Sequence, residues 1–338
     1  MKSSNLEFYR NSIDYILSVQ NMDGSIPWEF EKKLDPWDHI EAAMGLSIGR
    51  KKEESERAFI WLRDNQLSDG SWYAEYLNSI PATKRRETNF SAYIATGLWH
   101  YYLIFEDKDF IETMLPTLAK ALDFVLSMQT EGGDIYWASE EGKEILDDSL
   151  ITGSSSIYKS LECAAATFDI FDKPIESILV SMNKLKMSIN NNPQRYDRSW
   201  ESKSRYSMDW YYPILCGVYT HDKGISIIDS KWSEFIVEGK GCKCVSEEPW
   251  VTVAESSELV MALVKLGLVD KAEDLFNSLH QWRDEDGLYW TGYVYTDKKF
   301  WPVEKPTWTA GAVLLAADTL YGFTPGHELF LQDWTSLN

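Results

Sequence analysis

A turn that recurs along the chain constrains the fold more than any other feature. Four helix-like stretches end in glutamine, an Asp-Gly or Gly-Gly pair then makes a turn, and a tryptophan follows; the turns begin at Gln20, Gln66, Gln129 and Gln281. Glycine in such a turn can adopt a positive φ, and the tryptophan can fold back over the helix end. A unit repeated in this way predicts a repeat architecture.

The segments between the turns are of two kinds that alternate. Apolar segments rich in small residues are Pro36–Gly49, Glu87–Phe105, Ile151–Phe168, Tyr206–Tyr219, Val251–Leu266 and Thr307–Leu320. More polar helical stretches are Leu6–Gln20, Glu53–Gln66, Leu115–Gln129, Ile175–Asn190, Ile225–Val237 and Asp270–Gln281. Helices that are apolar nearly all round must be buried, whereas helices with one apolar stripe cover them.

Six helices of each kind predict an all-α fold, an (α/α)6 barrel in which an outer ring wraps an inner ring. We expect one toroid domain over residues 1–338; an open solenoid of the same hairpins is the alternative. Patches such as Tyr293–Thr296 are too short to predict a sheet.

Composition excludes several classes of protein. The chain has 53 acidic and 33 basic side chains and a net charge of −20, which argues against binding to nucleic acid or an anionic membrane. No apolar run approaches the roughly 20 residues of a membrane span, and the N-terminus has no signal-peptide core. Four cysteines do not form a disulfide framework, and the histidines lack i,i+4 partners. We expect a cytoplasmic protein without metal or cofactor, and its oligomeric state stays open.

The turns and several longer strings resemble known families. Gln-x-x-Asp-Gly-Ser-x-Trp resembles the QW-type repeats of terpenoid cyclases and protein prenyltransferase β-subunits, and six-hairpin glycosidases have similar turns and the same toroid. Strings that begin at Pro36, Arg205, Pro249 and Pro306 resemble bacterial and archaeal proteins labelled prenyltransferase-like, over almost the whole chain. The resemblance implies the toroid but little about chemistry, because that label rests on the repeat. The chain lacks the Asp-x-Asp-Asp of class II cyclases and the zinc ligands of prenyltransferases.

One end of the predicted barrel collects the chemically useful residues. Each Gln-x-x-Asp-Gly turn leads from an outer to an inner helix, so all these turns lie at the end where the inner helices begin. The candidate catalytic carboxylates there are Asp38, Glu41, Asp148, Asp209 and Glu255. The candidate substrate-binding residues are Trp37, Trp72, Glu87, Asn89, Arg205, Trp210, Tyr211, Trp250, Glu304 and Trp308.

The carboxylates differ in what their sequence positions imply. Asp35 is a predicted N-cap, and Asp38 fits either a capping box or chemistry. Glu41 and Glu255 lie deeper in apolar helices, where an unpaired carboxylate is costly and needs a partner or a function. Neighbouring aromatic residues predict a raised pKa for Asp209, as a general acid requires.

Aromatic rings and carboxylates at one mouth favour a sugar substrate. Tryptophan can stack on the apolar face of a sugar ring, and glycosidic cleavage needs two carboxyls about 5–5.5 Å or 6.5–9.5 Å apart. Isoprenoid chemistry also uses aromatic walls, by cation–π attraction, but favours few carboxylates. We therefore predict a glycoside hydrolase acting on a small-molecule or oligosaccharide substrate. Asp38 and Asp209 are expected to face each other in one cavity, with Glu255 as a third corner.

Two other functions are compatible with the same mouth. One is an isoprenoid-type enzyme, either a terpene cyclase or prenyltransferase-like, with Asp148 as proton donor or diphosphate-side ligand. The other is a non-catalytic module that binds glycan or lipid.

Overall fold

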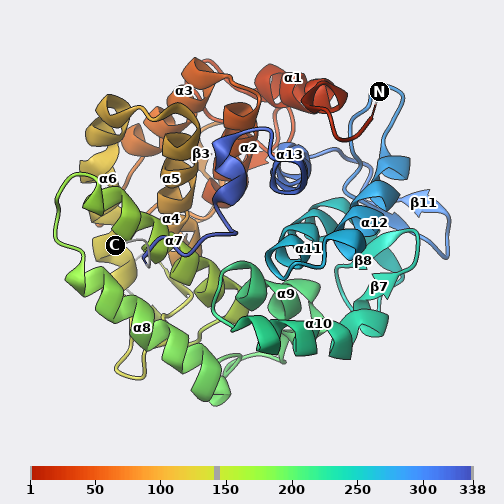
Figure 1. Ribbon diagram of the computed structural model, residues 1–338. Helices are drawn as coiled ribbons and strands as arrows, with labels where there is room; N and C mark the ends of the chain where they lie inside the picture. The colour runs from red at the N-terminus through yellow and green to blue at the C-terminus, as the bar shows by residue number, and fades with distance from the viewer. Residues whose placement is uncertain (1, 141–144, 336–338) are drawn as a thin grey trace.

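The inner helices of the protein form a closed ring (Figure 1). The computed structural model describes residues 2–140 and 145–335, so Met1 and the last residues of the predicted domain lie outside it. Each inner helix packs against the next in chain order, and the last packs against the first. The inner helices are α2 (Pro36–Ile48), α4 (Thr88–Ala92) continued by α5 (Ile94–Phe105), α7 (Ile151–Asp169), α9 (Ser207–Leu215), α11 (Val253–Lys265) and α13 (Thr307–Tyr321). The predicted (α/α)6 barrel is confirmed, and the open solenoid is wrong.

An outer ring of more polar helices covers the inner ring. Every residue of α2 is buried, whereas α3 buries one stripe that contains Phe59, Trp61 and Leu62. The two rings were predicted from this difference between helices that are apolar all round and amphipathic helices. The outer helices are α1 (Arg10–Val19), α3 (Lys52–Asp64), α6 (Lys108–Ser127), α8 (Glu176–Asn191), α10 (His221–Phe235) and α12 (Val269–Leu279).

The recurring glutamines join neighbouring outer helices. Gln66 Nε2 donates to the carbonyl of Gly70 in its own turn at 3.0 Å and to the carbonyl of Thr117 on α6 at 2.8 Å. Gln20 and Gln129 make the same pair of bonds to their own turns and to the next outer helix. The repeated turn is therefore a hydrogen-bonded connection between successive hairpins, which explains its recurrence.

The ring closes where α2 and α13 cross. A Cβ atom at Gly311 of α13 would lie 2.7 Å from the carbonyl oxygen of Glu41 on α2, so only glycine permits this approach. The crossing also brings Trp308, in the first turn of α13, close to Glu41.

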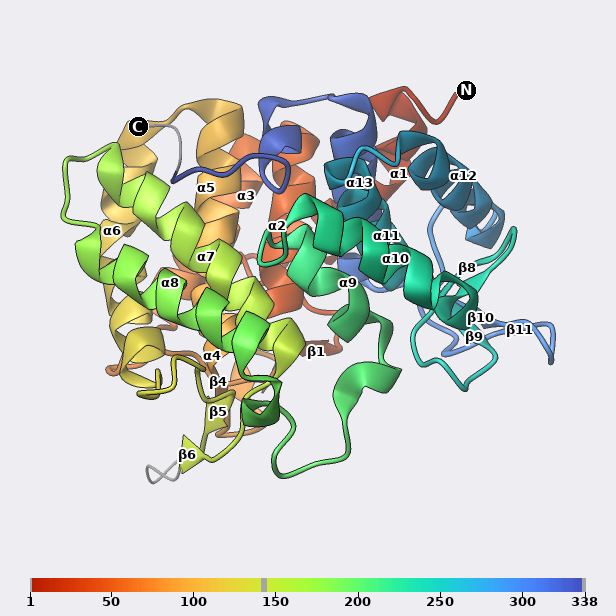
Figure 2. The same ribbon diagram turned by 60° about the horizontal axis from the view of Figure 1, so that its bottom comes forward.

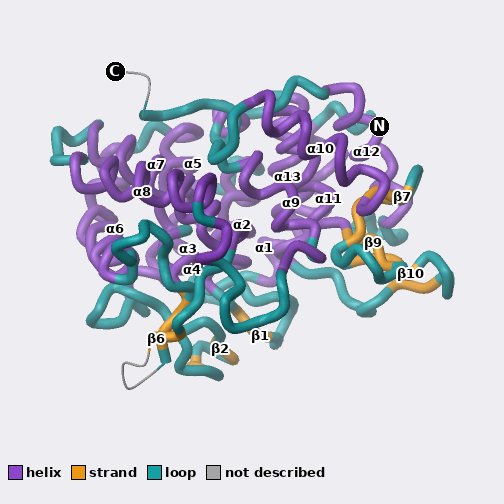
Figure 3. Tube along the Cα trace, turned by 90° about the horizontal axis from the view of Figure 1, so that it is seen from below, coloured by secondary structure: helices purple, strands orange, loops and turns teal. Residues whose placement is uncertain are grey.

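Short strands gather at the end where the inner helices begin (Figures 2 and 3). Two three-stranded sheets comprise β1 (Lys33–Leu34), β2 (Tyr76–Leu77) and β3 (Ile80–Pro81), and β4 (Arg86–Glu87), β5 (Ala138–Ser139) and β6 (Ile145–Leu146). A five-stranded antiparallel sheet has the order β11-β10-β9-β8-β7, from β7 (Ile236–Val237), β8 (Gly241–Lys243), β9 (Trp250–Thr252), β10 (Gly292–Val294) and β11 (Lys299–Phe300).

The expectation that the patch around Tyr293 is too short for a sheet is wrong. Tyr293 belongs to β10 and pairs with Val251 of β9 and Phe300 of β11. The ring holds hairpins from different repeats next to each other, so strands of two or three residues find partners that their own length does not indicate.

The C-terminal segment crosses the opposite end of the barrel (Figure 2). The backbone N–H of Trp334 donates to Glu162 Oε1 at 2.6 Å, and Lys159 Nζ donates to the carbonyl of Gln332 at 3.0 Å. Lys159 and Glu162, both on α7, are buried and pair with each other at 3.1 Å. This segment therefore covers the far end through bonds to buried charges. Within the described residues, no helix is both long and apolar enough to cross a membrane.

Candidate active site

The first turns of α2 place three carboxylates on one side of the helix. Asp35 is the N-cap and accepts a hydrogen bond from the backbone N–H of Asp38 at 2.9 Å, with Pro36 at the first helical position. Asp38 and Glu41 follow at spacings of three residues, which share a helix face. The N-terminal end of α2 thus brings Asp38 and Glu41 to the site, and Asp35 caps the helix.

Asp38 is a buried carboxyl group whose surroundings favour its protonated form. Its side chain lies against that of Asp35, and Asp38 is 7% exposed. Burial raises the pKa of Asp38 well above its ordinary value, and the neighbouring Asp35 carboxylate raises it further, while the Lys33 ammonium opposes this. A carboxyl group of this kind can donate a proton near neutral pH.

Glu41 lies deeper in the barrel than Asp38. Tyr93 donates its phenol hydrogen to Glu41 Oε1 at 2.8 Å, while Oε2 has no hydrogen-bond partner within the described part of the chain. Burial raises the pKa of Glu41 to about 7, although the hydrogen bond from Tyr93 and the nearby indole N–H groups of Trp308 and Trp37 oppose the rise. Glu41 has a partner and also keeps one oxygen free.

Two further carboxylates enter the same interior from α11. Glu255, in the first turn, is 6% exposed and lies beside Cys244, where burial raises the pKa of the thiol and the Glu255 carboxylate raises it further. Glu258 lies one turn deeper, is fully buried and accepts hydrogen bonds from the phenols of Tyr211 and Tyr212.

The two groups of carboxylates influence each other. Burial raises the pKa of Glu258 well above normal, and the Glu41 carboxylate from α2 raises it further, while the bonds from Tyr211 and Tyr212 oppose this; Glu255 adds a smaller upward effect. Tyr212 connects the two helices, because its phenol donates to Glu258 of α11 and its ring lies 5.8 Å from that of Trp37 on α2; the acidic groups of α2 and α11 therefore face one shared region. Glu258 is not among the carboxylates predicted from the sequence, although its place one turn after Glu255 and the Tyr211-Tyr212 pair were signals.

Aromatic rings separate and surround these carboxylates. Trp37 stacks on Tyr93 with ring centroids 4.3 Å apart, and Tyr212 lies 5.8 Å from Trp37. Nearer the surface, the half-buried rings of Trp28 and Trp308 lie 5.9 Å apart. The inner rings form the floor of the site, whereas Trp28 and Trp308 remain partly open to a ligand.

Several buried polar atoms at this end lack a partner. Within the described residues, the side-chain atoms Trp308 Nε1, Thr309 Oγ1, Thr252 Oγ1 and Ser207 Oγ make no hydrogen bond. They lie at or near the starts of α13, α11 and α9. A buried polar group without a partner costs about 1–3 kcal/mol. Such groups together at one end are suited to bonding with a polar ligand.

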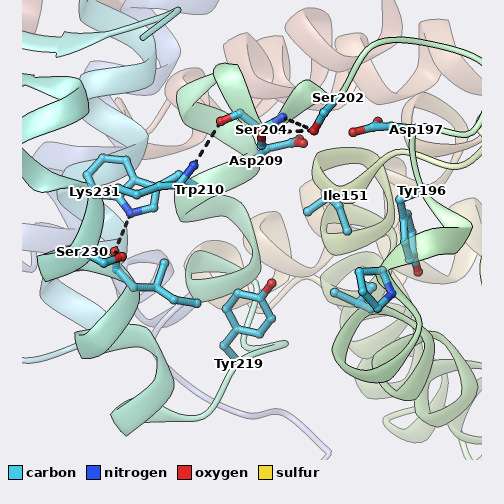
Figure 4. A pocket seen from close by; sticks show the side chains of 13 residues that line it. Ile151, Tyr196, Asp197, Ser202, Ser204, Asp209, Trp210, Tyr219, Ser230 and Lys231 are labelled. Carbon is cyan, nitrogen blue, oxygen red and sulfur yellow. Dashed lines mark hydrogen bonds between the residues drawn. The ribbon is translucent and has the colours of Figure 1, made fainter.

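Asp209 faces another part of the molecule (Figure 4). Its carboxylate accepts a 2.5 Å hydrogen bond from the Thr152 hydroxyl and lines a pocket of about 460 Å³ with Tyr196 and Lys231, between α8 and α10. Burial raises the pKa of Asp209 to about 6, as its aromatic neighbours predict, while the bond from Thr152 opposes the rise.

The expectation that Asp38 and Asp209 share one cavity is therefore wrong. Each residue turns a helix by about 100°, so Asp209 and Tyr211 lie about 200° apart around α9. Tyr211 points inward to Glu258, and Asp209 consequently points outward.

Asp148 is a structural group. Its carboxylate accepts hydrogen bonds from the backbone N–H groups of Ser149, Arg198 and Ser199 and from the Ser199 hydroxyl. Burial would raise the pKa of Asp148, but these bonds outweigh it and the pKa lies below normal. A carboxylate that is ionised and saturated with donors cannot be the proton donor of the isoprenoid alternative, and that assignment is wrong.

Some predicted sugar-stacking residues are packed inside the protein. Trp72 is buried and donates to the carbonyl of Leu62 at 2.8 Å. Trp210 is buried, stacks on Phe235 of α10 and donates to a backbone carbonyl. These two indoles do not offer a free face to a sugar, and neither do the indole of Trp37 and the phenol of Tyr211. Trp250 and Trp308 remain partly exposed.

The remaining predicted residues lie around the mouth. Glu87 pairs with Arg85 at 2.8 Å; burial raises the pKa of Glu87, and the Asp35 carboxylate adds to the rise against the effect of Arg85. Asn89 faces Gly153 of α7, and Arg205 pairs with Glu247. Glu304 is half-buried, and its backbone carbonyl accepts from Thr291.

The described residues contain no group of three or more His, Cys, Asp or Glu side chains placed to hold a metal ion. The four cysteines are free thiols.

Comparison with known proteins assigns the chemistry. No family model matches the sequence. The chain is 41% identical over 321 residues to the MMP endo-(1,4)-3-O-methyl-α-D-mannosidase of Mycolicibacterium hassiacum, and the alignment covers 95% of this chain and 88% of the relative. The chain belongs to this glycoside hydrolase family.

Solved structures agree with the fold of this glycoside hydrolase. A wild-type glycosidase superimposes with a TM-score of 0.73 at 12% identity, over 94% of this chain and 97% of the other. The GH63 mannosylglycerate hydrolase of Thermus thermophilus gives a TM-score of 0.73 at 10% identity, over 91% and 99% of the two chains. They confirm the resemblance to glycosidase toroids, whereas the resemblance to prenyltransferase-like proteins gains no support from them.

Proposed function

We propose that this glycoside hydrolase cleaves an α-mannosidic bond inside an O-methylated oligo- or polysaccharide, with Asp38 as general acid and Glu255 as the second carboxylate. The substrate class rests on the 41% identical relative, whose name is that of an endo-(1,4)-3-O-methyl-α-D-mannosidase. The observation that carries the assignment of residues is the shared interior of α2 and α11, in which the acidic groups of both helices act on Glu258.

Depth within the barrel distinguishes the reacting carboxylates from the supporting ones. Glu41 and Glu258 are almost or fully buried and accept hydrogen bonds from tyrosines. Asp38 and Glu255 lie one turn nearer the mouth on the same two helices and retain some exposure. A sugar that enters from the mouth reaches the upper pair first, so Glu41 and Glu258 act as positioning residues beneath it.

The proposed reaction gives the two upper carboxylates different roles. Asp38, protonated because of burial and the Asp35 charge, donates its proton to the glycosidic oxygen as the bond breaks. Glu255 acts on the other side of the sugar ring, where an oxocarbenium-like centre develops: water adds to that centre, directly or after a covalent bond to Glu255, and the proton it releases goes to the carboxylate that acts as base. Trp28 and Trp308 offer ring faces to the sugar, and the unpaired hydroxyl of Thr252 can bond to it.

Release of reducing ends from defined glycans tests this proposal. Wild-type protein, Asp38→Asn and Glu255→Gln are incubated with O-methylated α-1,4-mannan oligosaccharides, unmethylated α-mannan and α-glucan. We expect cleavage of the methylated mannan by wild type and a fall of about 100-fold or more in each variant, with melting temperatures unchanged or raised. Retention of full activity by either variant would contradict its assignment. Cleavage of α-glucan alone would contradict the substrate class.

A further inference from the structure

The five-stranded sheet carries a half-buried and an exposed tryptophan beside the proposed active site. Strand β9 begins at Trp250 and runs directly into α11, whose first turn contains Glu255. Trp301 follows β11, is 52% exposed and packs edge-on against Trp250 with ring centroids 5.0 Å apart. Large exposed apolar side chains in a group mark a contact surface more often than isolated ones do.

The backbone of the sheet holds this pair in place. Trp250 Nε1 donates to the backbone carbonyl of Trp301 at 2.7 Å, so the orientation of the Trp250 indole is fixed. Gly292 of β10 makes room for it, because a Cβ there would lie 2.4 Å from Trp250 Nε1. The Trp250 indole is thus ordered before any ligand arrives, which lowers the entropy lost on binding.

The two indoles line a pocket of about 550 Å³. Pro249 and Val294 add apolar surface, and Glu248 and Lys299 stand at its rim. Ring faces and aliphatic groups next to charged hydrogen-bonding groups suit a ligand that is apolar on its faces and polar at its edges. A sugar carrying O-methyl groups has this character.

We propose that Trp250, Trp301 and the pocket between them bind a sugar unit of the substrate chain away from the bond that is cleaved. This inference rests on the proposed function, because it assigns the occupant as a more distant part of the same O-methylated glycan. The continuity of β9 with α11 supports that occupant: at about 3.3 Å per residue, the strand spans about 10 Å between Trp250 and the start of the helix. A glycan held at Glu255 can therefore reach the sheet a few sugar units further along.

Dependence on chain length tests this subsite. Trp301→Ala removes the exposed ring but leaves the bond to Trp250, because the acceptor is a backbone carbonyl. We expect kcat/KM to fall about tenfold on long methylated oligosaccharides and to stay unchanged on the shortest oligosaccharide that the wild type cleaves. Trp200→Ala is the matched control, since Trp200 is also exposed but lies outside this pocket; it should leave both values unchanged.

Three results would overturn the subsite. An equal loss of kcat/KM on short and long substrates would mean that Trp301 acts in the cleavage site or stabilises the fold. No loss of kcat/KM on either substrate would mean that Trp301 does not bind the glycan. A concentration-dependent dimer that Trp301→Ala abolishes would make a second copy the occupant. If wild-type protein cleaves none of the glycans, the proposed function fails separately. Isothermal titration calorimetry of the methylated oligosaccharide with wild type and Trp301→Ala then decides whether the subsite binds it.

Discussion

Asp38 and Asp209 show that similar carboxylates acquire different roles from their surroundings. Burial raises the pKa of both, but only Asp38 lies in the interior shared by α2 and α11. The carboxylate of Asp209 bonds to Thr152 and faces the pocket between two outer helices. A raised pKa identifies a carboxyl that can hold a proton, and position decides whether a substrate can receive it.

Asp38→Asn should therefore lower kcat by about 10²–10⁴-fold and change KM little, because an amide cannot donate the proton required in the transition state. In the wild type, kcat/KM should fall as the pH rises through the elevated pKa of Asp38, since the acid must be protonated. Kinetics between about pH 5 and pH 9 measure both effects. Asp209→Asn is the control and should keep kcat within about threefold; a larger loss would return Asp209 to the mechanism.

Asp148→Asn should destabilise the protein by about 1–3 kcal/mol at neutral pH, because several donors lose a charged acceptor. The pKa of Asp148 is lower in the folded than in the unfolded state. Its contribution to stability is therefore complete above the unfolded pKa of about 3.9 and is lost as the pH falls towards the folded value. Urea unfolding of both proteins at about pH 7 and pH 3.5 should show the difference shrinking in acid. A constant difference would mean that the charge of Asp148 is unimportant.

At the scale of elements, the repeated turn joins one hairpin to the next. In the turn after α3, Gly70 has a φ of +93°, and a Cβ at this position would lie 1.9 Å from the carbonyl oxygen of Lys120 on α6. The glycine therefore satisfies two demands, a left-handed backbone and close contact with the neighbouring helix. Gly267, after α11, satisfies only the first: its φ is +71°, and nothing lies within 4 Å of a Cβ there.

Comparing alanine at these two glycines separates the two demands. Gly267→Ala should cost about 1–2 kcal/mol of stability from backbone strain alone. Gly70→Ala should cost a further 1–3 kcal/mol or so, because α6 must move away from the turn. Chemical denaturation of the two variants measures the difference. Equal losses would show that the contact between hairpins at Gly70 adds nothing to stability.

Much of the element pattern could be predicted from the sequence because it rests on local information. The glutamine turns and the apolar segments such as Pro36–Gly49 indicate helices, their burial and their order. The direction in which a short helix such as α9 points its polar residues depends on contacts with neighbouring repeats. The prediction that Asp209 faces the barrel interior is wrong for this reason. The five-stranded sheet and the role of Glu258 could not be predicted for the same reason, since both depend on partners from other hairpins.

On the scale of the whole molecule, one end of the barrel carries the acidic site and the other is covered by the C-terminal segment. Lys265, near the end of α11, donates to the carbonyl of Phe330 in that segment. Burial lowers the pKa of Lys265 to about 7, and the nearby Lys159 charge adds to this effect. The covering of the far end therefore leaves a lysine that loses its proton near neutral pH.

Lys265 should contribute a gain in stability as the pH rises from about 7 towards 10, because in this range the unfolded state binds a proton on Lys265 that the folded state has lost. Lys265→Met should reduce this gain. The melting temperatures of both proteins at about pH 7 and pH 9.5 provide the test. Lys271→Met, at an exposed lysine on α12 that pairs with Asp229, is the control and should follow the wild type. Parallel curves for Lys265→Met and the wild type would contradict the low pKa.

Covering of the far end also restricts how a polymer can meet this protein. The barrel interior is packed with buried side chains, and the segment around Trp334 lies across its base, so no strand can be threaded through the ring. A glycan must therefore enter and leave at the mouth. For the internal cleavage proposed above, a long chain lies across the mouth with both of its ends in solvent, the site needs no chain terminus, and the two fragments leave by the side from which the glycan arrived.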